Sequence, residues 1–311
     1  MKRILVLGSV VMAAVCAAAL GAQQPAGPAA PGGAQGRGGG RGPGFPPVAA
    51  AEKVADNLYM IAGQGGNTAV WVMANGVLLV DTKLVNNGQA ILDEVKKVTD
   101  KPVTHIVNTH SHADHNGSNA FFPPAVEIVA QEKGIPRVQE QFKDARQGIP
   151  DRGYKDTLTL FRGKERVDLY HFGAAHTDND TYVVFREARV MHTGDTFASK
   201  APAFLDRASG GSGIAIGATL GRATREVKDV ERVITGHSTV LPWQDFVDWA
   251  EYNNLFLSHA NASLKAGRSA EEAAKTFAPG PKFAGYGAVA GGRGGPAGNF
   301  GIIYEELKAA R

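Results

Sequence analysis

The sequence predicts a mixed α/β (α+β) fold in which sheets are covered by helices. Short runs rich in apolar and β-branched residues alternate with segments of helical periodicity between residues 49 and 267. The dipeptide Asn75-Gly76 separates two of the runs, residues 68–73 and 77–80, and favours a tight hairpin turn. In Gly88–Val98, by contrast, the apolar residues Ile91, Leu92 and Val95 recur at helical spacing.

The remaining elements follow from the same two patterns, taken in chain order. Apolar runs typical of strands occupy residues 58–62, 68–73, 77–80, 103–108, 127–130, 167–172, 181–185, 190–192 and 233–235. A long helix is expected at residues 241–264, because Pro242 stands near its start and apolar residues form one stripe along it. That stripe comprises Trp243, Phe246, Val247 and Ala250. A shorter helix is expected at residues 214–220.

The first 22 residues have the pattern of an export signal. Lys2 and Arg3 precede an apolar run, and small residues follow it, with Ala22 as the expected last residue of the signal. A retained membrane anchor is the alternative, although the run is at the short limit for a membrane span. We therefore expect a periplasmic or secreted protein with no stable membrane span after signal removal. Cleavage also removes Cys16, the only cysteine of the 311 residues.

Glycine-rich segments flank the expected domain. Residues 23–48 consist mainly of Gly, Pro, Ala and Gln, a composition typical of a flexible linker. Residues 268–311 are expected to form a Gly-rich tail with short helices. The catalytic domain is therefore expected at residues 49–267. The net charge is +3, with no basic tract dense enough to predict a nucleic-acid interface, and the sequence leaves the oligomeric state open.

The strongest chemical signal is Thr109-His110-Ser111-His112-Ala113-Asp114-His115, directly after an expected strand. Three imidazoles and one carboxylate fall within a short loop, and both groups are zinc ligands. The alternative, a solvated polar loop, is less compatible with clustered histidines, which repel one another when protonated. Three weaker motifs follow or end later strands: Gly173-Ala174-Ala175-His176-Thr177-Asp178-Asn179-Asp180, His192-Thr193-Gly194-Asp195-Thr196 and Thr235-Gly236-His237-Ser238.

In this order, the motifs resemble those of the metallo-β-lactamase superfamily over roughly residues 54–260. The resemblance implies a four-layer αβ/βα sandwich with metals at one edge. It implies a first zinc ion on His110, His112 and His176, and a second on Asp114, His115 and His237. Asp195 would bridge the two, and Asp81 would support a ligand from outside the metal sphere.

The resemblance also implies a mechanism with two zinc ions per chain. A metal-bound hydroxide would attack an ester, thioester or amide-type small-molecule substrate, with Asp114 orienting the water. Lys200 is a candidate contact for a substrate carboxylate, although a solvated lysine is the commoner case. Ser212 follows Gly210-Gly211 before the short expected helix, where free N–H groups could face an anionic substrate or simply cap the helix.

Three other functions are compatible with the motifs. A class B β-lactamase of the cysteine-free branch is one, although the motif at residues 192–196 is more similar to the glyoxalase II and generic hydrolase branch. A single-iron enzyme like the persulfide dioxygenases is another, and the presence of all second-metal ligands argues against it. The last is a non-catalytic metal-binding partner protein. The choice between zinc, iron and manganese stays open.

Overall fold

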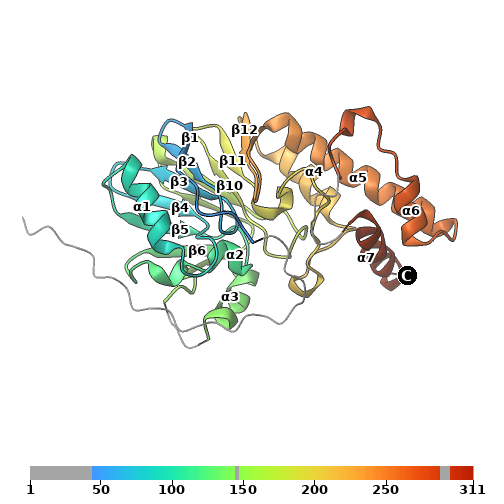
Figure 1. The fold of residues 1–311 in the computed structure, drawn as a ribbon, viewed down its shortest axis with the longest axis horizontal. Coiled ribbons are helices and arrows are strands. Elements are labelled where there is room, and N and C mark those ends of the chain that lie inside the picture. The colour runs from blue at the N-terminus through green and yellow to red at the C-terminus, as the bar shows by residue number, and fades with distance from the viewer. Residues whose placement is uncertain (1–43, 144–146, 288–294, 311) are drawn as a thin grey trace, which may run out of the picture.

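The computed structural model describes residues 44–143, 147–287 and 295–310, which form two sheets and the helices that cover them (Figure 1). The expected signal at residues 1–22 and most of the expected linker lie outside these ranges. Within them, no helix is both long enough and apolar enough to cross a bilayer.

The first sheet has its strands in chain order, β1 to β7. Pairing is antiparallel from β1 to β4 and parallel from β4 to β7. All four residues of β4 are buried, as expected for a strand covered on both faces. The strands are β1 (Glu52–Ala55), β2 (Leu58–Ile61), β3 (Thr68–Val72), β4 (Val77–Val80), β5 (Val103–Val107), β6 (Glu127–Gln131) and β7 (Arg152–Tyr154).

The second sheet has the order β13-β12-β11-β10-β9-β8. Its neighbours are antiparallel except for β11 and β12, which are parallel. Consequently β9, β11 and β12 all run in one direction and end at the same edge of the sheet. The strands are β8 (Thr157–Leu160), β9 (Val167–Tyr170), β10 (Tyr182–Phe185), β11 (Val190–His192), β12 (Arg232–Ile234) and β13 (Val240–Pro242).

Three separate hydrophobic clusters show that the fold has four layers. One lies between the first sheet and α1 (Gly88–Val98), and a second lies between the two sheets. The third joins the second sheet to α4 (Ile216–Glu226) and α5 (Trp243–Lys265). Figure 1 accordingly shows the sheets between α1 on one side and α4 and α5 on the other. This helix–sheet–sheet–helix order confirms the four-layer sandwich.

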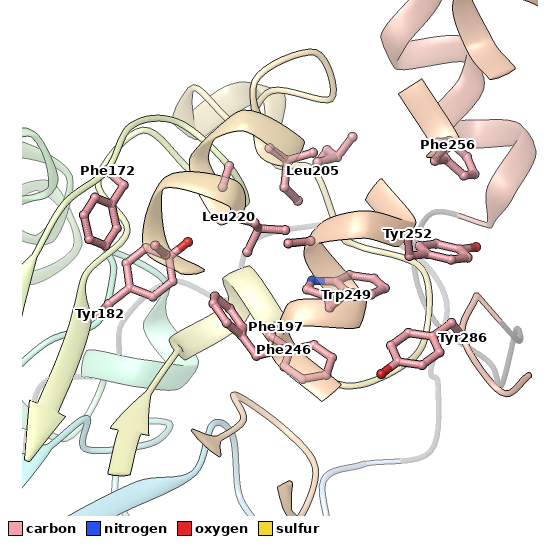
Figure 2. Close-up of a cluster of buried hydrophobic side chains, with 14 of the residues drawn as sticks. Phe172, Tyr182, Phe197, Leu205, Leu220, Phe246, Trp249, Tyr252, Phe256 and Tyr286 are labelled. Carbon is pink, nitrogen blue, oxygen red and sulfur yellow. The ribbon is translucent and has the colours of Figure 1, made fainter. Parts of the chain in front are cut away.

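Figure 2 shows part of the third cluster, in which aromatic rings fill the space beside α5. Trp249 stacks on Phe197 with ring centroids 5.4 Å apart, and its indole nitrogen donates to the carbonyl of Thr196. Since Thr196 directly follows Asp195, this buried contact anchors α5 beside a candidate metal ligand. Helix α5 therefore stabilises the segment that carries Asp195.

The segment after residue 267 continues the same core. Helices α6 (Ala270–Thr276) and α7 (Pro296–Ala309) pack against each other and against α5. Phe300 is fully buried and stacks on Phe256 at 4.0 Å, and Phe283 is also buried. Residues expected in a Gly-rich tail thus contribute side chains to the hydrophobic core.

Several elements differ from the sequence expectation. The helix expected from residue 241 begins at Trp243, because the preceding residues pair with β12 as strand β13. The helix expected at residues 214–220 is α4 and runs on to Glu226. Strands β1, β7 and β8 were not expected, and neither were the short helix α2 (Ala113–Asn116) and helix α3 (Ile135–Phe142).

Candidate metal centre

All the segments that carry candidate ligands follow strand ends at one edge of the sandwich. The first motif follows β5, next to β4, which ends just before Asp81. His176 lies after β9, Asp195 after β11 and His237 after β12, the three strands that share a direction. Ends of parallel strands meet at one sheet edge, so the topology brings residues far apart in sequence together.

The first group consists of His110, His112 and His176, with one ring nitrogen of each facing the others. Nε2 of His176 lies 3.3 Å from Nε2 of His110 and 3.0 Å from Nδ1 of His112. Zinc–nitrogen bonds of 2.0–2.1 Å place two ligands of a tetrahedral ion about 3.3 Å apart. The three nitrogens are therefore spaced as ligands of one small cation.

The second group consists of Asp114, His115 and His237. Nε2 of His237 lies 3.2 Å from Nε2 of His115 and 3.4 Å from Oδ2 of Asp114. Asp195 lies between the two groups: its Oδ2 is 3.2 Å from Nε2 of His237 and 3.8 Å from Nε2 of His176. One carboxylate is thus within reach of both groups.

Four of the five imidazoles are held through the ring nitrogen that faces away from the centre. A bond from that nitrogen fixes the tautomer and leaves the other nitrogen a lone pair for a metal. The four pairs are His115 Nδ1 to Asp81 Oδ2 at 2.7 Å, His110 Nδ1 to Thr109 Oγ1 at 3.0 Å, His112 Nε2 to Asp206 Oδ2 at 2.7 Å, and His176 Nδ1 to the Phe204 carbonyl at 2.6 Å. Thr109 in turn donates its hydroxyl proton to Asp81, so it accepts from His110.

Two glycines make room for the ligands. A Cβ on Gly236 would lie 2.0 Å from Oδ1 of Asp195, and a Cβ on Gly66 would lie 2.2 Å from the ring of His115. Neither neighbour can give way without leaving its place in the centre. Gly236, in the motif at residues 235–238, is therefore needed to leave space for the carboxylate of Asp195.

Burial differs sharply across the centre. His110, His115 and His176 are buried, whereas the side chains of His112, Asp114 and His237 are 21%, 23% and 24% exposed. Solvent therefore reaches the centre at these three side chains, one from the first group and two from the second.

Two histidines of the first group, His110 and His176, have lowered pKa values. Burial, together with the neighbouring imidazoles of His115 and His112, holds the pKa of His110 well below its ordinary value. Burial lowers the pKa of His176 to about 4, although Asp195 opposes the shift. Neutral imidazole is the form that binds a metal.

The second group shows the opposite balance. Burial lowers the pKa of His115, but the carboxylates of Asp195, Asp114 and Asp81 outweigh it and raise that pKa well above its ordinary value. Burial raises the pKa of Asp195, but His237 and His115 hold it well below the usual range. The carboxylates therefore create a site that favours positive charge.

An observation independent of these pKa shifts shows that the residues fit a metal ion. Oδ1 of Asp195 is buried and accepts no hydrogen bond from the described residues, although Nε2 of His115 lies 3.3 Å away. A buried carboxylate oxygen without a donor is costly. A cation held by Asp195 and His115 would satisfy it, and the donor set of imidazole and carboxylate suits zinc.

The two residues predicted to contact substrate, Lys200 and Ser212, form their contacts with residues outside the two ligand groups. Nζ of Lys200 lies 2.5 Å from Oδ1 of Asp245 on α5 and 4.8 Å from the ring centroid of Tyr286. Oγ of Ser212 donates to Oε2 of Glu306 on α7 at 3.2 Å. The four other histidines also have partners away from the two groups: His105 with Glu127, His171 with the Asp180 carbonyl, His192 with the Asn67 carbonyl and His259 with the Ala273 carbonyl.

Sequence reasoning missed two of the supporting residues. Asp206 and Phe204 lie in the loop before α4, and no local pattern marks them. Asp206 is 94 residues from the histidine it binds, and Phe204 acts through its backbone carbonyl, which no residue type reveals. Thr109 belongs to the first motif, and only its position directly before His110 indicated that it could support a ligand.

Known proteins share this architecture. The family model for the metallo-beta-lactamase superfamily matches residues 63–237, more than half of the chain. The solved metallo-beta-lactamase from Pontibacter korlensis is similar with a TM-score of 0.57 at 16% identity, over 67% of this chain and 99% of that chain. DIM-1 metallo-beta-lactamase is similar with a TM-score of 0.57 at 15% identity, over 68% of this chain and 98% of that one.

Similarity to alkylsulfatases extends over more of the chain. The inverting sec-alkylsulfatase Pisa1 from Pseudomonas sp. gives a TM-score of 0.68 at 14% identity, over 83% of this chain and 50% of that chain. A linear primary-alkylsulfatase from Pseudomonas sp. (strain ATCC 19151) is 39% identical over 74 residues. The match covers 21% of this chain and only 14% of that curated relative, so the chain spans a small part of its length.

The family match covers every candidate metal ligand from His110 to His237, and the structure gathers these ligands at one edge of the sandwich. The chain therefore belongs to the metallo-beta-lactamase superfamily.

Proposed function

We propose that the protein is an exported hydrolase that uses two zinc ions to cleave an ester, thioester or amide-type bond of a small molecule. The position of Asp195 carries the proposal, because its carboxylate reaches a ligand nitrogen of each group. A single-metal site has no need for a buried carboxylate shared in this way. His110, His112 and His176 would hold one ion, and Asp114, His115 and His237 would hold the second.

Bound zinc supplies Lewis acidity and lowers the pKa of water to about 7, which provides a nucleophile at neutral pH. The protein's own groups do the rest. Asp114 is partly exposed, so its carboxylate can orient a water molecule and accept its proton. Asp81, Thr109, Asp206 and the Phe204 carbonyl hold four imidazoles in place, so the centre needs little rearrangement.

Alkyl sulfate esters are the second candidate substrate class. The likeness to Pisa1 covers 83% of this chain, against 68% for the DIM-1 enzyme. The additional similarity, together with the 39% identical segment, favours ester cleavage over β-lactam cleavage. The chain covers so little of the primary-alkylsulfatase that its substrate is carried over here only as a class to be tested.

Metal analysis coupled to a substrate panel tests the proposal. We expect about two zinc ions per chain and turnover of carboxylic, thio- or sulfuric esters, abolished by exhaustive chelation and restored by zinc. Asp114→Ala should lose at least about a hundredfold in kcat, consistent with the worth of a proton-transfer group, while the exposed Asp93→Ala control keeps full activity.

Other results on the same sample would support a different function. Nitrocefin turnover without ester turnover favours a β-lactamase, and one iron per chain with oxygen consumption favours a dioxygenase. Tight metal binding without any turnover favours a non-catalytic binding protein.

Export is proposed from the first 22 residues alone. Expression in a bacterium with a periplasm should yield a protein in the periplasmic or culture fraction that begins after Ala22, as read by N-terminal sequencing. Recovery of the intact N-terminus in the membrane fraction would indicate a retained anchor instead.

A further inference from the structure

Four large hydrophobic side chains are exposed among the described residues: Phe45, Val85, Phe204 and Leu255. A single exposed hydrophobic residue is ordinary in a folded protein. Two of these four, however, place their rings against imidazoles of the metal centre. That placement, rather than their exposure, calls for an explanation.

Phe45 stacks on His237 of the second group, with ring centroids 5.9 Å apart and an interplanar angle of 21°. The backbone around it is tied to the loop after β2. Nε2 of Gln64 donates to the Phe45 carbonyl at 3.0 Å, and N of Gln64 donates to the Pro46 carbonyl at 2.8 Å. Gly63 permits the approach, since a Cβ there would lie 2.0 Å from the Pro47 carbonyl oxygen. The end of the expected linker is therefore fixed across the site.

Phe204 lies at the other end of the centre, against the first group. Its ring centroid is 5.5 Å from that of His176 and 6.2 Å from that of His112. Its own carbonyl accepts the 2.6 Å hydrogen bond from Nδ1 of His176. The contact that orients a metal ligand thus also fixes where this phenylalanine stands.

Each of the two rings lies against a partly exposed candidate ligand of the centre. His112, Asp114 and His237 are the partly exposed ligands, and Phe204 and Phe45 contact the first and the last of them. We propose that Phe45 and Phe204 form an apolar rim that binds the hydrocarbon part of a substrate whose polar group enters the metal centre. The substrate class is then an amphiphilic ester with an alkyl or aryl group of several carbons.

The chemistry of the two parts requires this kind of ligand. Imidazoles and carboxylates with their metals bind an ester or anionic head, whereas half-exposed phenylalanine rings gain by covering hydrocarbon. A small polar ester would leave both rings in water. The inference rests on the proposed hydrolase function for the reaction, but it concerns binding and can be measured separately.

Binding of two phosphonates to the zinc-loaded full chain tests the rim without turnover. Hexylphosphonate and methylphosphonate share a head group and differ in hydrocarbon length. Full burial of a methylene is worth up to about fourfold in affinity, and rings that are partly exposed should give less. We expect hexylphosphonate to bind about tenfold or more tightly than methylphosphonate by calorimetry.

Variants locate the effect. Phe45→Ala and Phe204→Ala should each reduce the hexyl-to-methyl ratio to about threefold or less, while Phe45→Leu should retain most of it. Leu255→Ala is the matched control, because Leu255 is a similarly exposed hydrophobic residue, 38% exposed on α5. Its hexyl-to-methyl affinity ratio should equal that of the unmodified chain. The proposed rim would be contradicted by equal hexyl-to-methyl affinity ratios in all variants, or by no preference for hexylphosphonate in the unmodified chain. Circular dichroism of each variant excludes misfolding as the cause.

Ester kinetics distinguish this inference from the proposed function. On p-nitrophenyl hexanoate and acetate, kcat/KM should favour the hexanoate, and both phenylalanine variants should reduce that preference mainly through KM. If no ester is turned over but the phosphonate preference depends on the two rings, the hydrolase proposal fails and the rim stands. If esters are hydrolysed without any chain-length preference, the rim fails and the hydrolase stands.

Discussion

Oδ2 of Asp206 lies 2.7 Å from Nε2 of His112, and this pair joins the loop before α4 to the motif after β5. The bond leaves Nδ1 of His112 facing His176. Because the carboxylate sets both the tautomer and the orientation of a ligand, its loss should weaken the first metal site rather than the fold.

For Asp206→Ala we expect zinc affinity at the first site to fall by about 10- to 100-fold, the usual effect of removing such a support. Competition with a chromophoric chelator measures the affinity of each zinc equivalent. Asp229→Asn serves as the control, since Asp229 has φ +60°, a conformation that asparagine also tolerates. Unchanged zinc affinity in Asp206→Ala would contradict the assignment.

Glu306 should contribute to stability through the same loop. This buried carboxylate on α7 accepts from Arg207, from Oγ of Ser212 at 3.2 Å and from N of Ile214 at 2.9 Å. Glu306→Ala leaves these donors without their acceptor, and we expect a loss of about 1–3 kcal/mol in the free energy of unfolding, measured with urea.

An exposed ion pair provides the comparison. Arg189 and Glu231 form a surface pair at 2.7 Å, with both side chains more than half exposed. Glu231→Ala should therefore cost less than about 1 kcal/mol. Equal losses in the two variants would show that α7 does not anchor the loop.

Gly236→Ala should disable the shared carboxylate. The added Cβ would lie 2.0 Å from Oδ1 of Asp195, so that side chain must move away from both groups. We expect elemental analysis to find fewer than two zinc ions per chain and kcat to fall by more than about a hundredfold, the scale of losing a metal-based step. Gly301→Ala is the control, because a Cβ on Gly301 of α7 would have no atom within 4 Å. This variant should bind as much zinc as the unmodified chain and keep full activity.

Lys83 should make stability depend on pH above neutrality. Its buried amine donates to the carbonyls of Ile61 and Gly66. Burial lowers the pKa of Lys83 to about 7 from 10.5, although Asp81 opposes the shift. Between these two pH values the unfolded chain binds one more proton than the folded chain, so the free energy of unfolding rises with pH across that window. Below about pH 7 both states are protonated, and this contribution to the slope disappears.

Urea unfolding between pH 6 and pH 10 measures that slope. Lys83→Met should be less stable than the unmodified chain, because two carbonyls lose their donor. The slope of its free energy of unfolding against pH should be smaller by up to the equivalent of one bound proton. Lys96→Met, on the exposed face of α1, should keep the slope of the unmodified chain. Identical slopes in all three proteins would contradict the shifted pKa.

Local patterns were sufficient for several of the helices and strands. The structure has Val77–Val80, Gly88–Val98 and Val190–His192 with the expected bounds. Their apolar spacing is determined within a few residues and requires no distant partner. Strand β13 was missed because it exists only by pairing with β12. Short helices were expected after residue 267, but the bounds of α7 were not, because that helix is stabilised by packing on α5.

The amino-acid order alone indicates which groups could bind metal and where they occur along the chain, because a dense run of imidazoles and carboxylate after a strand has few other uses. It could not determine what surrounds them. Asp206, the Phe204 carbonyl and Phe45 reach the centre only through contacts between segments distant in sequence. Such contacts depend on how two sheets and their loops pack in space, and no short-range pattern records that packing.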